Sequence, residues 1–301
     1  MKQHTLADSI TLEGKGLHTG RMVRMVINPA PEDTGIVFHR TDLTCDDATI
    51  PALAEYVAAT ERGTVLSKGD CTISTVEHCL SALYALGIDN SLIELNGPEV
   101  PILDGSAKYF VQGIKRAGIV EQSADCKEWI VEHEVSFDHG ISHIHISPAD
   151  HYELNVHIAF DSPVLNSQDA SAKSLDDYPA DIAECRTFVF IREIEALLAA
   201  GLIKGGDLAN ALVIYDRETS PENLRKLAES KGETIREIDS FGYINGPLKF
   251  ENEPARHKLL DLIGDLSLIG CRIRGRIDAE CPGHGVNSAC AKMIREKYIT
   301  K

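Results

Sequence analysis

The feature that most constrains the fold is an order of predicted elements that occurs twice along the chain. Each time, β-like segments precede a helix with a histidine near its start, and a further strand and helix follow. Both runs of elements have apolar faces that must be buried, so we expect an α+β fold of two similar modules packed together. The first module is assigned to residues 1–124 and the second to residues 125–301.

Hydrophobic periodicity and turn residues predict the individual elements. In the first module the predicted strands are 9–14, 21–30, 35–43 and 91–97, and the predicted helices are 74–87 and 106–118. The polar stretch 121–129 is the candidate linker. In the second module a three-stranded meander is predicted for 129–140, 141–151 and 152–161, followed by a polar segment at 161–180. The later predictions are helices at 192–201, 221–232, 254–270 and from about 286, with strands at 209–216 and 271–280.

Composition argues against several classes of protein. The formal net charge of −16 disfavours a nucleic-acid partner, because binding to phosphates needs clustered lysine and arginine. There is no transmembrane segment, since no run of about 18 apolar residues occurs. The first residues lack the apolar core of a secretion signal, so we expect a cytoplasmic location. The eight cysteines form no C-x-x-C pair, which indicates scattered reduced thiols.

The segment RHKLLDLIGDL, at 256–266, reads as a helix with an unusual polar face. At about 100° per residue, Asp261 lies about 40° from His257 around the axis, and Asp265 about 80°. The leucines and isoleucine occupy the opposite arc. The helix is therefore either an ordinary amphipathic surface helix or one that presents His257 and Asp261 as two ligands of a metal ion.

A third ligand is needed, because zinc hydrolases usually use three nitrogen or oxygen ligands and leave one position for water. His78, near the start of the first module's helix, is the best candidate, since equivalent helices of two modules can face each other. The adjacent Glu77 could then take a proton from water. Alternatively, Ser74 and Glu77 form a capping box, and the sequence leaves both interpretations open.

GHGVNS, at 283–288, supplies another candidate. His284 lies between two glycines, and a histidinium there could stabilise an oxyanion and protonate a leaving nitrogen. Asp265 could hold it charged by accepting its second N–H. The alternative is a turn histidine without a role. His143 and His145 alternate with isoleucines, so they are expected on the wet face of a strand, whereas His18 lies in a glycine-rich turn.

Five segments in fixed order, STVEH, NGPEVPILDGSA, RTF, RHKLLDLIGDL and GHGVNS, closely resemble the UDP-3-O-acyl-N-acetylglucosamine deacetylase family, and the opening GKGLHTG is similar to it as well. These enzymes are zinc amidases at the committed step of lipid A biosynthesis. The resemblance spans essentially the whole chain. It implies a β-α-α-β sandwich in which each module has a small insert. In some members an acyl-carrier-protein dehydratase follows in the same chain.

The resemblance also implies a cofactor and a substrate. The cofactor would be Zn²⁺, with Fe²⁺ possible in the cell, and the substrate a small-molecule UDP-sugar that carries a fatty acyl chain. A monomer is expected. The implied metal ligands are His78, His257 and Asp261, and the implied catalytic residues are Glu77 as general base, His284 as a cation supported by Asp265, and Thr187 as hydrogen-bond donor to the oxyanion.

The substrate-binding residues follow from the same resemblance. Lys258 would meet polar or phosphate groups, Phe188 and Phe190 lie where the family packs the sugar and the acyl chain, and Phe160 resembles the position that stacks on uracil. The insert at about 192–215 resembles a βαβ element that shapes a passage for the acyl chain, although a small helix packed on a strand would give the same pattern. Two other classes remain as alternatives: a sugar-nucleotide phosphoester hydrolase and a non-catalytic zinc-stabilised binding protein.

Overall fold

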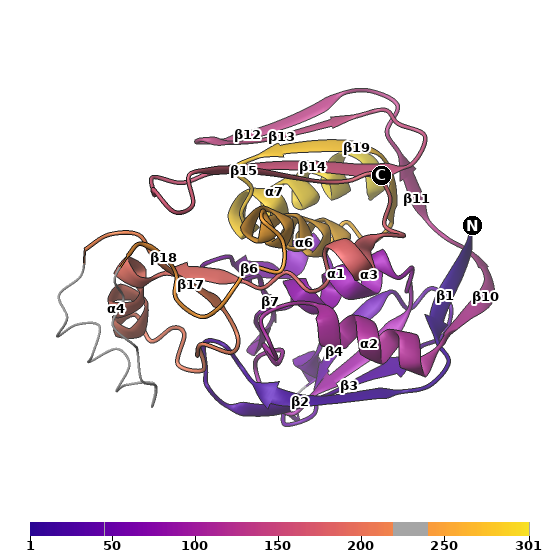
Figure 1. The fold of residues 1–301 in the computed structure, drawn as a ribbon. Coiled ribbons are helices and arrows are strands. Elements are labelled where there is room, and N and C mark those ends of the chain that lie inside the picture. The colour runs from indigo at the N-terminus through magenta and orange to yellow at the C-terminus, as the bar shows by residue number, and fades with distance from the viewer. Residues whose placement is uncertain (45, 219–239, 301) are drawn as a thin grey trace.

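The computed structural model describes residues 1–44, 46–218 and 240–300 and shows an α+β fold with several sheets (Figure 1). The expected α+β class is thus confirmed. The helix predicted at 221–232 lies outside the described residues. None of the helices in the described ranges is long and apolar enough to cross a bilayer.

The first large sheet is built from β2 (Ile10–Lys15), β3 (Met22–Pro29), β9 (Ser91–Leu95), β4 (Ile36–Arg40) and β5 (Thr49–Pro51), in that spatial order. Neighbouring strands are antiparallel except β9 and β4, which are parallel. Buried and exposed side chains alternate along β3, and Val23, Met25 and Ile27 face the core. This period of two is what places one apolar face of the sheet against the helices.

The second large sheet has the order β12 (Val135–His139), β13 (Ser142–Ser147), β19 (Arg272–Glu280), β14 (Tyr152–Ala159) and β15 (Ser167–Ala172). Its strand directions repeat those of the first sheet, with the only parallel pair of this path between β14 and β19. A short strand, β11 (Glu128–Ile130), also pairs with β19. The predicted meander is therefore wrong, because β19 lies between β13 and β14. The side chains of Ile273, Ile277 and Ala279 on β19 are buried, as expected for a strand in the middle of the sheet.

The long helices α1 (Glu77–Ala85), α2 (Lys108–Ala117), α6 (Glu253–Ser267) and α7 (His284–Ile294) lie between these two sheets (Figure 1). α6 packs against β14 and β15 on one side and against α1 on the other. Gly264 permits the close approach of α6 to α1, because a Cβ at this position would lie 2.1 Å from the Glu77 carbonyl oxygen. This contact joins the helices that carry His78 and His257 at the centre of the molecule.

Smaller elements flank the central layers. β1 (Lys2–Leu6) pairs with β10 (Ile119–Asp125), so most of the candidate linker at 121–129 is strand rather than loop. β6 (Val57–Ala59), β7 (Val65–Lys68) and β8 (Cys71–Ile73) form one small sheet. β16 (Phe188–Phe190), α4 (Ile191–Ala199) and β17 (Leu212–Tyr215) form a β-α-β unit that β18 (Gly242–Tyr243) extends, and a short helix, α3 (Tyr178–Asp181), precedes it.

Candidate active site

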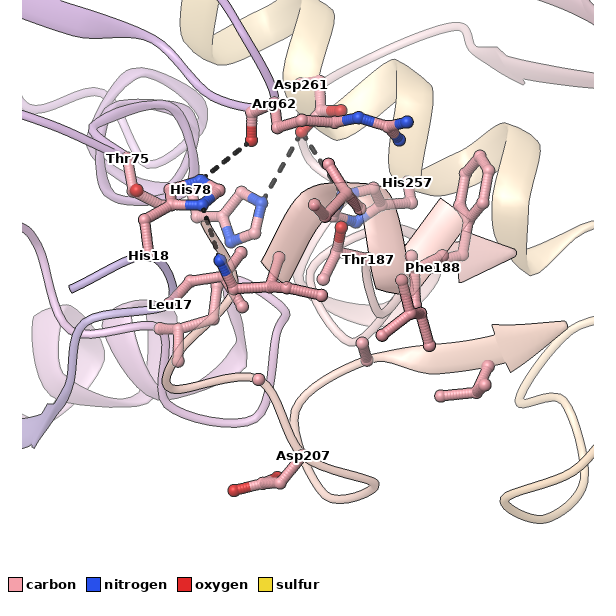
Figure 2. Close-up of a pocket in the computed structure, with 18 of the residues that line it drawn as sticks. Leu17, His18, Arg62, Thr75, His78, Thr187, Phe188, Asp207, His257 and Asp261 are labelled. Atoms are coloured by element: carbon pink, nitrogen blue, oxygen red, sulfur yellow. Dashed lines mark hydrogen bonds and ion pairs between the residues drawn. The ribbon is translucent and has the colours of Figure 1, made fainter. Parts of the chain in front are cut away.

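The contact between α1 and α6 brings His78, His257 and Asp261 together in the interior. All three are buried, and one ligand atom from each lies within 4.8 Å of the others. The Nε2 atoms of His78 and His257 lie 3.6 Å and 3.4 Å from Asp261 Oδ1 (Figure 2). A tetrahedral ion with ligand bonds of about 2.0–2.1 Å separates its ligand atoms by about 3.4 Å. The spacing of the donor atoms therefore fits one zinc-sized ion.

The chemistry of the donors also fits a cation. Burial is the main reason why the pKa of His257 falls to about 4, so its imidazole is neutral at neutral pH. Its Nδ1 lies 3.0 Å from the carbonyl oxygen of Cys185, so Nδ1 carries the hydrogen and the Nε2 lone pair points toward Asp261. Asp261 Oδ1 is buried and has no hydrogen-bond partner among the described residues. A cation among these atoms would satisfy both the oxygen and the lone pair.

Asp261 is ionised despite its burial. Desolvation opposes the charge, but His257, Lys258 and His284 outweigh it and hold the pKa of this carboxyl well below its usual value. Lys258 Nζ donates to Asp261 Oδ2 over 2.9 Å, so the second oxygen is paired while Oδ1 faces the histidines. The polar face predicted for the 256–266 helix is thus an inward-facing cluster. It is not the wet side of a surface helix.

Glu77 lies at the start of α1, next to His78. Its Oε2 accepts a 2.9 Å hydrogen bond from the Thr64 amide, whereas the Ser74 amide donates to the Pro98 carbonyl. The capping box with Ser74 is therefore not formed. Burial, above all, raises the pKa of Glu77, and the opposing attraction of His284 and His78 is weaker. A buried carboxylate with a raised pKa is a suitable proton acceptor.

His284 is the first residue of α7 and faces the same cluster, so it is not a simple turn residue. Its Nδ1 lies 3.0 Å from Asp265 Oδ2, and its Nε2 lies 3.9 Å from Asp261 Oδ2. Burial alone would lower the pKa of His284, but Asp265 and Asp261 outweigh it and raise that pKa to about 9. The imidazole is therefore a buried cation at neutral pH, with the Asp265 carboxylate as its nearest charged partner.

One end of a cavity of about 230 Å³ is formed by polar side chains of this cluster, namely Glu77, His78, His257, Lys258, Asp261 and His284. Arg62, His18 and Thr75 join them at this end (Figure 2). The rest of the lining is mainly apolar, apart from Asp207, and it draws its side chains from both halves of the chain and from the β16–α4–β17 unit. The apolar lining consists of Leu17, Ile102, Phe188, Val189, Ile194, Leu197, Ile203, Leu208, Ala211, Val213 and Ile244.

The remaining predicted residues are placed as follows. Thr187 and Lys258 line the cavity, and the Thr187 amide donates to the Gly105 carbonyl of the DGS turn. Phe188 lines the cavity, whereas Phe190 is buried. Phe160 packs against both rings, at 5.5–5.6 Å between ring centroids. The substrate contacts of all these residues stay predictions: Thr187, Lys258, Phe188, Phe190 and Phe160. His143 and His145 lie on β13, outside the cluster.

Sequence reasoning missed several residues that support the site. Thr64 donates to Glu77 through its amide and to Asp265 through its hydroxyl. Asn287 donates to Asp265 Oδ2 over 2.9 Å. Asn287 lies one helical turn after His284 in GHGVNS, so its spacing was a usable signal. Thr64 carries no such signal, because it lies 13 residues before Glu77 and 201 residues before Asp265, outside any regular helical or strand spacing.

Comparison with known proteins identifies the family. The family model described as LpxC: UDP-3-O-acyl N-acetylglycosamine deacetylase matches residues 3–236 and 227–296 of the chain. The chain belongs to this deacetylase family. It is 38% identical over 287 residues to the UDP-3-O-acyl-N-acetylglucosamine deacetylase of Geobacter sp., covering 95% of this chain and 86% of the relative. The resemblance of the five segments is thus confirmed.

Other relatives in the deacetylase family are longer. The chain is 50% identical over 299 residues to the bifunctional enzyme LpxC/FabZ of Porphyromonas gingivalis, covering 98% of this chain and 64% of the relative. A protein of the same name from Bacteroides thetaiotaomicron is 50% identical over 300 residues, which are 99% of this chain and 65% of the relative. The chain thus spans slightly less than two thirds of the length of these bifunctional relatives.

Proposed function

We propose that this chain hydrolyses the N-acetyl group of UDP-3-O-acyl-N-acetylglucosamine and releases acetate, the committed step of lipid A biosynthesis. One observation carries the proposal: a buried His78–His257–Asp261 group lies beside Glu77, at the polar end of a cavity whose other end is mainly apolar, and Asp261 Oδ1 has no hydrogen-bond partner in the described part of the chain. A cavity of this kind suits a ligand with one polar reacting group and one long apolar chain. Family membership points to the same substrate.

His78, His257 and Asp261 would hold the metal. We propose zinc, because two neutral imidazoles and one carboxylate are a ligand set typical of catalytic zinc, and ferrous iron remains the alternative. When bound, such an ion polarises the carbonyl of the acetamide and lowers the pKa of water. The side chains around the metal-binding group would transfer protons and stabilise the negative charge that develops during hydrolysis.

Glu77 accepts the proton of the attacking water, because burial raises the pKa of its carboxyl group and makes the carboxylate a better proton acceptor. Negative charge develops on the former carbonyl oxygen as the tetrahedral intermediate forms. The hydroxyl of Thr187 donates a hydrogen bond to that oxygen, and the cationic imidazole of His284 stabilises it electrostatically. The amine nitrogen then leaves with a proton from His284 or from Glu77.

The apolar part of the cavity would receive the acyl chain. The β16–α4–β17 unit supplies Ile194, Leu197 and Val213 to its wall, so we propose that the insert at about 192–215 shapes the passage. Phe188 lies between this wall and the metal group, with its ring 6.5 Å from that of His257. Lys258 would meet a polar or phosphate group of the UDP-sugar.

The proposal extends to the architecture. Because both large sheets share the same order and directions of strands, we propose two duplicated modules, 1–124 and 125–301, that form a β-α-α-β sandwich with one small insert each. The β6–β7–β8 sheet would be the insert of the first module. A monomer in the cytoplasm, with no nucleic-acid partner, completes the proposal.

Product analysis tests the function directly. The metal-loaded chain is incubated with UDP-3-O-acyl-N-acetylglucosamine, and acetate, free amine and nucleotide are each quantified. We expect equal amounts of acetate and free amine, with the UDP group intact. Release of nucleotide with the acetyl group retained would instead indicate a phosphoester hydrolase, and no product at all would indicate a binding protein.

The charge of His284 predicts how activity depends on pH. The imidazolium is present below its pKa of about 9 and is lost as the pH rises through that value, so kcat/KM should fall on the basic side near pH 9. Asp265→Asn removes the strongest group that raises this pKa, so the basic limb should move to lower pH. Asp278→Asn, on β19, is the control. A basic limb at the same pH in Asp265→Asn would contradict the assignment of His284.

A further inference from the structure

Glu99, in the NGPEVPILDGSA segment, is completely buried and is held by neutral donors. Its Oε1 accepts hydrogen bonds from the His18 amide (2.8 Å) and the Thr75 hydroxyl (3.0 Å). Its Oε2 accepts from the amide (2.8 Å) and the hydroxyl (2.7 Å) of Thr19. Burying a carboxylate is costly unless it is fully hydrogen-bonded, so this arrangement specifies one conformation of the segments around it.

The first of these segments is the loop at 16–20, which contributes Leu17 and His18 to the cavity (Figure 2). Gly16 lets the loop close over the carboxylate, because a Cβ there would lie 2.2 Å from Glu99 Oε2. The loop in turn holds the segment that carries Ile203. The Gly205 amide donates to the Leu17 carbonyl over 2.9 Å, and the Lys204 amide donates to the His18 carbonyl over 3.3 Å.

The second segment leads into the metal-binding helix. Thr75 precedes Glu77 by two residues and has a φ of +59°, a conformation that is unfavourable for a β-branched side chain. The hydrogen bond from its hydroxyl to Glu99 helps to hold it there. One carboxylate thus contacts both the loop that contributes Leu17 to the apolar wall and Thr75, which lies just before α1.

We infer that Glu99 is a positioning residue that fixes the wall of the acyl passage relative to the metal group and thereby sets the preference for an acylated substrate. The inference rests on the proposed function. Glu99 itself does not line the cavity, so it acts through Leu17, His18 and Thr75. Substrate without an acyl chain makes no use of the wall, and its turnover should depend less on Glu99.

Glu99→Gln is the most informative variant. Each carboxylate oxygen accepts one backbone N–H, so the amide nitrogen of glutamine faces a backbone donor in either orientation. A buried donor without an acceptor is unfavourable, and the loop should move away. Thr19→Val is a milder variant that removes one hydroxyl, which donates to Glu99 and accepts a 3.3 Å hydrogen bond from the Arg21 amide. Glu94→Gln, on β9, is the matched control, because its carboxylate bonds to Asn28 and does not contact the loop.

The experiment compares kcat/KM for UDP-3-O-acyl-N-acetylglucosamine with kcat/KM for UDP-N-acetylglucosamine. In Glu99→Gln we expect this ratio to fall roughly tenfold or more, mainly through a higher KM for the acylated substrate. Thr19→Val should lower the same ratio by a smaller factor, and Glu94→Gln should leave the ratio unchanged.

An unchanged ratio in Glu99→Gln, even with a lower melting temperature, would reduce Glu99 to a purely structural role and overturn the inference. If Glu99→Gln does not fold, Thr19→Val decides, and an unchanged ratio there overturns the inference as well. Failure of the proposed function is a separate outcome, because the unmodified chain would then release no acetate from either substrate.

Discussion

Replacing Glu77 with glutamine is expected to lower kcat by about 10²- to 10⁴-fold, because the amide cannot accept the proton of the attacking water. The fold should survive. Glutamine keeps an oxygen that can accept the Thr64 amide hydrogen, and the residue is not one of the three metal ligands. Initial rates of acetate release, together with the melting temperature and metal content, check this prediction.

The control for Glu77→Gln is Ser74→Ala, which removes the partner that a capping box would require. The Ser74 hydroxyl donates to the Pro98 carbonyl and does not contact Glu77, so this variant should stay active. Comparable activity in the parent chain and in Glu77→Gln would remove Glu77 from the mechanism and leave it a structural role through Thr64.

The second large effect is expected from His257→Gln. Loss of one of three ligands should release most of the metal, and with it several kcal/mol of transition-state stabilisation, which corresponds to a rate loss of roughly a thousandfold or more. His145→Gln is the matched control, because His145 lies on β13 away from the cluster and should retain both metal and activity. Metal content is measured after dialysis. Full metal occupancy in His257→Gln would show that the ion is held elsewhere.

Helical periodicity predicted the central part of this site from the sequence. An i, i+4 spacing places His257 and Asp261 on one face of a helix whatever the rest of the chain does. Likewise, the adjacency of Glu77 and His78 is a local property of α1. The sequence could not show that the capping box is absent, because the competing partner of Glu77, the Thr64 amide, comes from a different segment.

Predictions failed where long-range pairing decides the structure. β19 inserts between two strands that are neighbours in sequence, and no local pattern indicates this. β15 was assigned to a polar segment because its inward positions are only alanines, which give a weak hydrophobic signal. Hydrogen bonds to backbone carbonyls cannot be predicted from residue types either. The Cys185 carbonyl orients His257, and any residue at position 185 would offer the same oxygen.

A metal titration of acetate release tests the central claim most directly. The chain is stripped of metal, zinc is added in known amounts, and the initial rate of acetate release from UDP-3-O-acyl-N-acetylglucosamine is measured at each step. The account predicts negligible activity without metal and a rate that rises in proportion to bound zinc until one ion per chain is reached. Acetate release at the full rate from the stripped chain would contradict it.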